Sequence, residues 1–377
     1  MDSENLAKNL LYHEYTAQLP EKTGCFFSGI EPILSPDSQT GKGYRMRILL
    51  IGGSHLIGHY LLPRLMDEGH HVTVLTRGTR PLSHPATEHL VGDRTILLRR
   101  NQVSGAFDAI IDNVAYTAQD CFDVLNAFQD RVTHYIVTST AFVYPEVEKA
   151  CTVPSRPYQE PDAGFLDEPP APSESTTHNE YIYGKRQMEY WLHHDARSYH
   201  LPITIIRPLL QVVGPNSEDG RFAWFWLRVL DGGPIWLPDE AHLKAGPCQL
   251  SFSGDVAQVI QASLHHPPPN LAVYNAGQPE IWTYEEYLNL MAEAVGRPLD
   301  IRYAPRAILN RWAGGTYRIP LPYPVAFDVS KTRRVLHVAN TPMADWVRAT
   351  GQWMSHHYMK SRPGWYETRG QERQWGL

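Results

Sequence analysis

The stretch that most constrains the fold runs from Met46 to Gly58. Its first part, Arg47–Ile51, is a short apolar and β-branched run, which predicts a buried strand. A glycine turn, Gly52–Gly58, follows, and from Tyr60 to Leu65 apolar side chains then recur at helical spacing. A strand, a glycine turn and a helix in this order are typical of a dinucleotide-binding unit. In such a unit the backbone N–H groups at the start of the helix face a pyrophosphate.

The glycine turn supplies the first candidate cofactor-binding residues. Gly52 permits the tight turn, and Gly58 lets the helix pack closely on the strand. The middle glycine of the usual spacing is replaced by His55. The residues that we expect to contact a cofactor here are Gly52, Gly53, Ser54, His55, Leu56, Ile57 and Gly58. A glycine-rich turn also occurs as a simple connection between a strand and a helix. Whether this turn binds a nucleotide therefore depends on the sequence that follows it.

Length, charge and composition narrow the class of protein. The chain has 377 residues, enough for one large α/β domain and a smaller lobe. Its net charge of −6 makes nucleic acid an unlikely main partner, and no window is apolar enough to cross a membrane. Four widely spaced cysteines and the doubled histidines show no ligand spacing, so we expect reduced thiols, a cytoplasmic protein and no metal.

The chain divides into four parts. Residues 1–45 are expected to be an extension, either a short amphipathic helix or a loose tail, and their acidic residues argue against a transit peptide. Residues 46–208 are expected to form the nucleotide-binding domain, completed by parts of 250–275. Residues 209–358 would be mainly a substrate-binding lobe, and 359–377 a polar C-terminal tail. In the lobe, the aromatic cluster Trp224–Trp226 fits either core packing or contact with a substrate.

Further strands and helices alternate after the first helix. The expected strands are His71–Thr76, Glu88–Val91, Phe107–Asn113 and His134–Thr140, with a helix at 118–130. Alternation of this kind predicts a Rossmann fold, an α/β fold with a doubly wound parallel sheet whose ligand crevice lies at the carboxyl ends of the strands. Thr140 stands at one of these ends.

The end of the second strand bears on the choice of cofactor. An acidic residue at this point binds the ribose hydroxyls of NAD, but the chain has Arg77 and Arg80 and no acid. A guanidinium suits the 2′-phosphate of NADP because its planar fork grips a phosphate with two hydrogen bonds. We therefore expect NADP(H) to be preferred, with NAD(H) as the alternative. The alternative is that the two arginines are solvated loop residues with no role in binding a cofactor.

A proline-rich stretch, Cys151–Glu180, is expected to be a long loop that closes over the site. The next stretch, 181–199, is expected to be a helix. Its Tyr181, Lys185 and Glu189 are four residues apart and share one face. A solvated Lys–Glu face would give the same pattern, but the hydroxyl-bearing strand end and the glycine turn upstream favour a functional tyrosine and lysine.

These motifs together resemble the extended or atypical short-chain dehydrogenase/reductases, the NAD-dependent epimerase/dehydratase superfamily. The resemblance covers roughly residues 46–358. It rests on Gly52, Gly53 and Gly58; Asp93; Thr138–Tyr144; Tyr181, Lys185 and Glu189; Ile206–Pro208 with Gly214 and Pro215; Ser251–Ala257; Tyr274–Gly277; and Thr283 at a helix start.

The resemblance implies roles for individual residues. Tyr181 would be the general acid/base, Lys185 would favour its phenolate and hold the nicotinamide ribose, and Thr140 would orient the substrate carbonyl. It also implies a homodimer. The further cofactor contacts that it suggests are Asp93, Asn113, Lys185, Arg207 and Pro208.

Three functions remain open at this point. The first is an NADP(H)-preferring oxidoreductase that acts on a carbonyl or alcohol of a small metabolite. The second is an NAD-dependent sugar-nucleotide epimerase; dehydratase chemistry is disfavoured because positions 141 and 142 are Ala and Phe instead of an acid pair. The third is a non-catalytic binding protein, for RNA or protein, which the intact Thr140, Tyr181 and Lys185 make less favoured.

Overall fold

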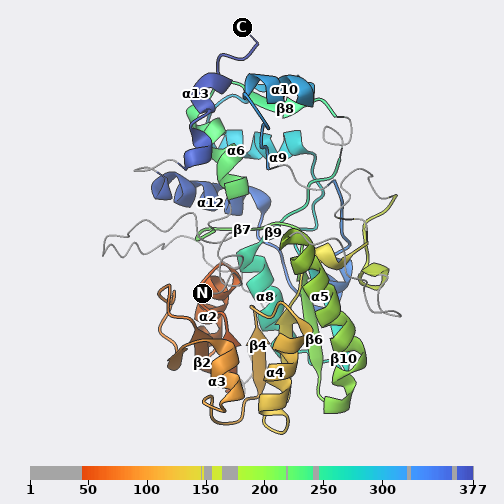
Figure 1. The fold of residues 1–377 in the computed structure, drawn as a ribbon. Helices are drawn as coiled ribbons and strands as arrows, with labels where there is room; N and C mark the ends of the chain where they lie inside the picture. The colour runs from red at the N-terminus through yellow and green to blue at the C-terminus, as the bar shows by residue number, and fades with distance from the viewer. Residues whose placement is uncertain are drawn as a thin grey trace, which may run out of the picture. The chain divides into compact units, whose positions relative to one another are not determined.

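A computed structural model describes residues 45–145, 147, 155–163, 177–217, 220–240, 246–320, 324–358 and 363–376. The helix expected near the N-terminus and much of the proline-rich loop lie outside these residues. Residues 44–377 form one compact unit. Figure 1 shows it with the large sheet and its helices in the lower half and the C-terminal helices above.

The expected doubly wound sheet is confirmed. Seven strands pair in the order β10-β6-β5-β4-β1-β2-β3, and every pairing is parallel. Their bounds are β1 Arg47–Ile51, β2 His71–Thr76, β3 Glu88–Val91, β4 Ala109–Asp112, β5 Tyr135–Thr138, β6 Ile203–Pro208 and β10 Leu271–Ala276. From β1 the chain adds β2 and β3 on one side and then β4, β5, β6 and β10 on the other, so the order of the strands switches between β1 and β4. In sheets of this kind the ligand crevice opens at this switch point.

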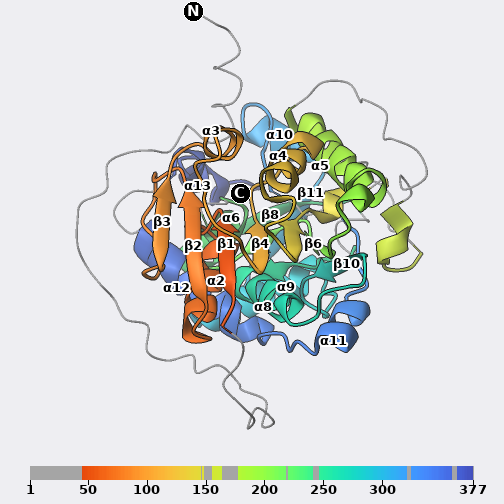
Figure 2. The same cartoon turned by 90° about the horizontal axis from the view of Figure 1, so that it is seen from below.

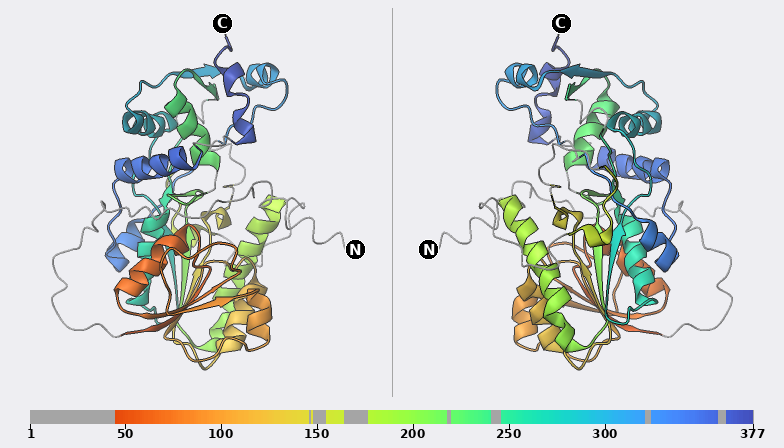
Figure 3. Two further views of the ribbon diagram at one scale, coloured as in Figure 1. Left: turned by 90° about the vertical axis from the view of Figure 1, so that its left-hand side faces the viewer. Right: turned by 90° about the vertical axis from the view of Figure 1, so that its right-hand side faces the viewer.

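Helices cover both faces of this sheet (Figures 2 and 3). One face packs against α3 (Arg94–Arg99), α4 (Ala118–Phe128) and α5 (Thr177–His194). The other packs against α2 (Ile57–Asp67), α8 (Ser253–Leu264) and α11 (Ser330–Leu336). Burial on both faces explains why β1 has an apolar run instead of alternating apolar and polar residues. The helix expected from residue 181 begins at Thr177, and a separate turn, η4 (Ala196–Tyr199), follows it.

The C-terminal lobe has its own apolar core. Its elements are α6 (Gly220–Asp231), β8 (Ile235–Pro238), α9 (Tyr284–Val295), β11 (Ile301–Ala304), α10 (Arg306–Trp312) and α12 (Met343–His357). Strands β8 and β11 pair in parallel, as do the short β7 (Val212–Val213) and β9 (Ser251–Phe252). The aromatic cluster Trp224–Trp226 is buried in this core, so these side chains pack instead of lining a surface.

The expected polar tail is corrected by the structure. Residues 363–376 form two short turns, η5 (Gly364–Tyr366) and α13 (Arg369–Glu372), that pack on the lobe. Glu372 is fully buried and accepts hydrogen bonds from Arg228 of α6 at 2.9 and 2.5 Å. The buried side chains Tyr366, Arg369, Glu372 and Trp375 recur at every third residue. A three-residue spacing of large side chains is the sequence signal for a packed segment here.

The described part of the proline-rich loop is tied to the core. Glu160, in the short turn η3 (Glu160–Ala163), is 7% exposed and accepts a hydrogen bond from the Asn275 backbone N–H at 3.1 Å. Tyr158 stacks on Tyr144, with ring centroids 5.2 Å apart. Residues 155–163 therefore form a fixed connection. Among the described helices, none combines the length and apolar character required to cross a bilayer.

Candidate functional site

The glycine turn is a tight turn that packs closely against the start of α2. Gly52 has a positive φ of 86°, and a Cβ on Gly58 would lie 2.5 Å from the Gly52 carbonyl oxygen. The helix α2 begins directly after Leu56, whose side chain makes no capping hydrogen bond. In the first turn of α2, Gly58 N donates to His55 O at 2.9 Å and His59 N to Leu56 O at 3.1 Å. The start of the helix has no side-chain cap, and its positive end is where an anion such as a phosphate is favoured.

The side chains beside this turn are basic. Arg80 Nη1 lies 3.5 Å from His55 Nδ1, so the residue that replaces the middle glycine meets one of the two arginines that follow β2. Arg77 is exposed at the end of β2. Burial lowers the pKa of His59, one residue after Gly58. The cationic character of this corner comes from the two arginines, and the fixed charge of their guanidinium groups suits a phosphate.

Two further candidate residues follow the next strands. Asp93 follows β3, is exposed, and caps α3 by accepting a hydrogen bond from Ile96 N at 3.1 Å. Asn113 follows β4, and its Oδ1 accepts a hydrogen bond from Thr138 Oγ1 at 2.7 Å. Its Nδ2 atom is buried and has no partner among the described residues. This amide is a hydrogen-bond donor left over at the carboxyl edge of the sheet.

Lys185 is the most deeply buried of the predicted catalytic residues. It is 3% exposed, and its Nζ donates hydrogen bonds to Ala115 O at 2.6 Å and Thr138 O at 2.8 Å. Nζ also faces the rings of Tyr116 and Tyr181, at 5.1 and 5.9 Å from their centroids. Burial lowers the pKa of Lys185 to about 8, against the opposing charges nearby.

Lys185 links helix α5, which carries Tyr181, to the end of β5, which Thr140 follows. Tyr181 precedes Lys185 by one turn of α5, is half-buried, and meets the ring of Tyr116 edge-on at 5.9 Å. Thr140 follows β5, is 6% exposed, and its Oγ1 accepts a hydrogen bond from Phe142 N at 3.3 Å. The structure thus brings Tyr181 and Lys185 together and binds Lys185 to the strand that leads to Thr140. Tyr116 is a neighbour that the sequence patterns did not single out.

Arg207 and Pro208 are both buried at the carboxyl end of β6. Arg207 is fully buried, with its guanidinium bound to Glu189 on α5, where Nη2 and Oε2 are 2.5 Å apart. It also donates to Tyr144 Oη and to Glu160 O, and Pro208 is the buried last residue of β6. The expected cofactor contact by Arg207 is therefore corrected: its donors are used inside the core. A charged residue near the end of an otherwise buried, mainly apolar strand is the sequence signal for a buried ion pair.

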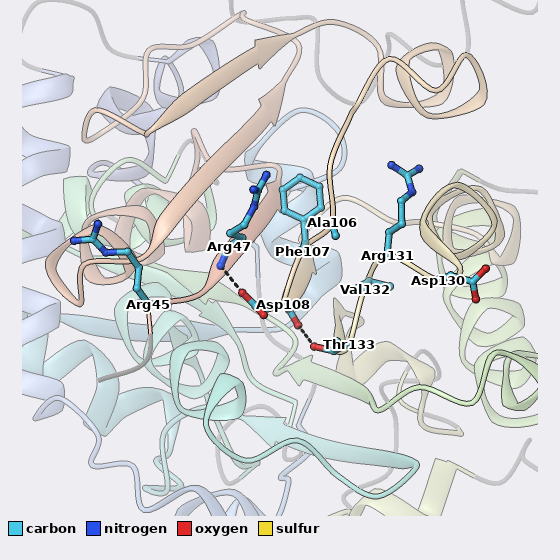
Figure 4. Close-up of a pocket in the computed structure, with 9 residues that line it drawn as sticks. All are labelled: Arg45, Arg47, Ala106, Phe107, Asp108, Asp130, Arg131, Val132 and Thr133. Carbon is cyan, nitrogen blue, oxygen red and sulfur yellow. Dashed lines mark hydrogen bonds between the residues drawn. The ribbon is translucent and has the colours of Figure 1, made fainter. Parts of the chain in front are cut away.

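A hollow of about 330 Å³ lies at the opposite edge of the sheet, beside the amino ends of β1 and β4 (Figure 4). Arg45, Arg47 and Arg131 line it together with Asp108 and Asp130. Arg131 is partly anchored, since its Nη1 donates to Gly105 O at 3.0 Å. None of the residues that line the hollow is one of the candidate site residues named above.

One group of metal-ligand side chains occurs among the described residues, Glu68, His70 and His265. His70 Nδ1 accepts a hydrogen bond from the Met46 backbone N–H at 3.3 Å. Its Nε2 therefore carries the proton and donates to Glu68 Oε2 at 3.0 Å. The group is a hydrogen-bonded link between the end of α2 and the end of α8.

Comparison with known proteins gives one match to a family model and several to solved structures. Residues 109–228, from β4 to α6, match the NAD_binding_4 family, described as "Male sterility protein". The UDP-glucuronic acid 4-epimerase of Bacillus cereus, solved in complex with NAD, is 17% identical with a TM-score of 0.60, over 85% of this chain and 99% of that one. The UDP-N-acetylglucosamine 4-epimerase of Bacillus cereus is 18% identical with a TM-score of 0.58, over 82% and 99%.

A curated relative has a name of a different kind. The chloroplast stem-loop binding protein of 41 kDa b of Arabidopsis thaliana is 26% identical over 278 residues. The alignment covers 69% of this chain and 66% of that protein, which is just under two thirds of its length.

Proposed function

We propose that this chain, which has the fold of the NAD-dependent epimerase/dehydratase superfamily of extended short-chain dehydrogenase/reductases, is an oxidoreductase. The reaction would be hydride transfer between NADP(H) and a carbonyl or alcohol of a small metabolite. The observation that supports it most strongly is Lys185, a cation buried beside Tyr181 and bound to the strand end that precedes Thr140. A buried, perturbed cation at the ligand edge of such a sheet is typical of an active site.

The residues divide the chemistry among them. Tyr181 exchanges the proton with the substrate oxygen, and the positive charge of Lys185 favours its phenolate form. Thr140, which follows β5, would hydrogen-bond the same oxygen. A nicotinamide cofactor, when bound, supplies the hydride. The uncapped start of α2, the Gly52–Gly58 turn and Asn113 Nδ2 are the groups that would hold it.

NADP(H) is the cofactor that the charges favour. Arg77 and Arg80 follow β2, and Arg80 contacts His55 in the glycine turn. This pair suits a phosphate on the ribose, whereas NAD would require a carboxylate at the same point.

The experiment is a fluorescence titration of the wild type with NADPH and NADH, repeated with Arg77→Ala and Arg80→Ala. We expect NADPH to bind more tightly, and each substitution to weaken NADPH about tenfold or more while NADH changes little. Arg348→Ala is the matched control, because Arg348 is an exposed arginine on α12. A wild type that binds neither nucleotide contradicts the proposal.

A sugar-nucleotide epimerase is the second candidate, favoured by the names of the structures with the same fold. In that reaction the hydride returns to the same substrate, so the enzyme keeps its cofactor. Purification with a bound nucleotide that exchanges slowly, together with preference for NADH, would favour the epimerase over the reductase.

A non-catalytic RNA-binding protein is the third candidate, favoured by the name of the curated relative and by the guanidinium groups of Arg45, Arg47 and Arg131 at the amino edge. Binding of an RNA stem-loop that weakens steeply with salt, in a protein without affinity for nicotinamide nucleotides, would select it.

A homodimer and a cytoplasmic location complete the proposal. The resemblance suggests pairing through α5 and its neighbour α4, and sedimentation velocity would distinguish monomer from dimer. The relative in Arabidopsis is named as chloroplastic, so localisation of a tagged full-length chain is the corresponding test.

A further inference from the structure

Tyr116 lies next to both proposed catalytic groups on α5. It belongs to the segment between β4 and α4, and 45% of it is exposed. Its ring meets that of Tyr181 edge-on, with the centroids 5.9 Å apart and the planes at 63°. The ammonium of Lys185 is 5.1 Å from its centroid, nearer than to the Tyr181 ring at 5.9 Å.

The backbone that carries Tyr116 is fixed on both sides. On one side, Ala115 O accepts a hydrogen bond from Lys185 Nζ, and a Cβ on Gly184 would lie 2.7 Å from Tyr116 O. Only a glycine at position 184 lets α5 pack so closely against this segment. On the other side, Asp120 Oδ2 accepts a hydrogen bond from Tyr116 N at 2.9 Å, as part of the cap of α4.

We propose that Tyr116 is a positioning residue whose ring stabilises the charged form of Lys185 and holds the Tyr181 ring in place. The role of Tyr116 in the reaction rests on the proposed function. The inference adds to that function a residue that lies outside the Tyr181–Lys185 motif.

The physical reason is the incomplete electrostatic support of Lys185. Its hydrogen-bond acceptors are two neutral carbonyls, of Ala115 and Thr138. The negative or ionisable groups that face it, and raise the pKa of its ammonium, are Cys121, Asp112, Glu189 and Asp120, from β4, α4 and α5. Asp112 is itself paired with Arg94, and Glu189 with Arg207. The negative faces of the Tyr116 and Tyr181 rings, 5.1 and 5.9 Å from Nζ, add to the stabilisation of the charge.

The test is the titration of Lys185 in the cofactor-free protein, followed by ¹⁵N NMR of its Nζ, assigned with Lys185→Arg. In Tyr116→Leu we expect the half-titration point to fall by about half a unit to one unit, a three- to tenfold loss of proton affinity. Tyr116→Phe keeps the ring and should titrate as the wild type does. Tyr199→Leu is the matched control, because Tyr199 is a tyrosine at the other end of α5, in η4.

An unchanged titration in Tyr116→Leu overturns the inference. It is equally overturned if Tyr116→Phe shifts as far as Tyr116→Leu, because the hydroxyl would then be responsible, or if Tyr199→Leu shifts as well. Thermal unfolding of each variant shows whether it has folded, and Tyr116→Trp, which keeps an aromatic face, replaces Tyr116→Leu if that variant fails.

Turnover separates this inference from the proposed function. Once a substrate is identified, Tyr116→Leu should lower kcat about tenfold with little change in KM. Tyr116→Phe, which keeps the ring, should have the kcat of the wild type. If the wild type binds no nicotinamide nucleotide, the proposed function fails, but the titration of Lys185 still decides the role of the Tyr116 ring.

Discussion

The two edges of the seven-stranded sheet hold positive charge in different ways. At the carboxyl edge Lys185 is 3% exposed and donates to two carbonyl oxygens. At the amino edge Arg45 and Arg47 are exposed, and Asp108 and Asp130 line the same hollow (Figure 4). Both edges belong to the same strands, so the fold itself does not dictate the difference.

The difference shows at which edge the fold buries a charge and loses its hydration energy. A buried ammonium bound only to neutral groups loses its hydration, and this desolvation lowers its pKa. Charges at the surface keep their hydration, so they reduce the stability of the fold very little. Perturbed ionisable groups of this kind cluster at functional sites. The carboxyl edge is therefore the better candidate for catalysis, and the amino edge for solvent-screened contacts with anions.

The largest expected effect is on turnover, through Tyr181→Phe. Loss of the proposed general acid/base should reduce kcat by about 10²- to 10⁴-fold while nucleotide affinity stays close to that of the wild type. Steady-state kinetics and nucleotide titration provide the measurement. At the opposite edge, Arg131→Ala should leave kcat unchanged; normal turnover in Tyr181→Phe would remove the basis for the contrast.

The next largest effect is expected from Gly58→Ala. The new Cβ would meet the backbone of Gly52 and Gly53 at 2.5–2.7 Å, which cannot be relieved by a side-chain rotation. We expect a loss of about 1–3 kcal/mol in the free energy of unfolding and loss of nucleotide binding. Gly315→Ala is the control, since nothing lies within 4 Å of its added Cβ. Equal urea midpoints for the two variants would show that the turn is not tightly packed.

The pH dependence should separate activity from stability. The pKa of Lys185 is about 8 in the folded protein and 10.5 when unperturbed. Turnover that requires the ammonium should fall about tenfold per pH unit above pH 8. Over the window from pH 8 to pH 10.5 the unfolded chain binds more protons at this site, so its contribution to stability rises with pH.

Lys185→Met isolates this contribution. The difference in unfolding free energy between wild type and Lys185→Met, followed across the window, should move in favour of the wild type as pH rises. A difference that is constant with pH would contradict the lowered pKa of the lysine.

The smallest effect is expected at the amino edge. For an oxidoreductase we expect only weak, salt-sensitive binding of an RNA stem-loop to the exposed charges of this edge, and Arg47→Ala and Arg131→Ala should each weaken that binding by only a few-fold. Filter binding at two salt concentrations measures both. Loss of affinity by more than a hundredfold, with nucleotide binding absent in the wild type, would reverse the assignment of the two edges.

Much of the sheet was predictable because its signals are local. Arg47–Ile51 and His71–Thr76 are strands with the expected bounds, since each is a short stretch rich in apolar and β-branched residues next to a turn. The glycine turn was predictable for the same reason: a positive φ at Gly52 and close packing at Gly58 depend on the absence of a side chain. The four-residue spacing of Tyr181 and Lys185 also fixed their adjacency on one helix.

What the sequence alone determined is thus the set of elements and the residues that each one presents. Only the tertiary structure decided which of these residues share an environment. Arg207 was expected to contact the cofactor, yet it is fully buried and its guanidinium binds Glu189. Tyr116 reads as a loop residue, yet Gly184 lets α5 approach it closely enough to place its ring beside Lys185. Contacts between elements far apart in the chain depend on packing distances that no local pattern specifies.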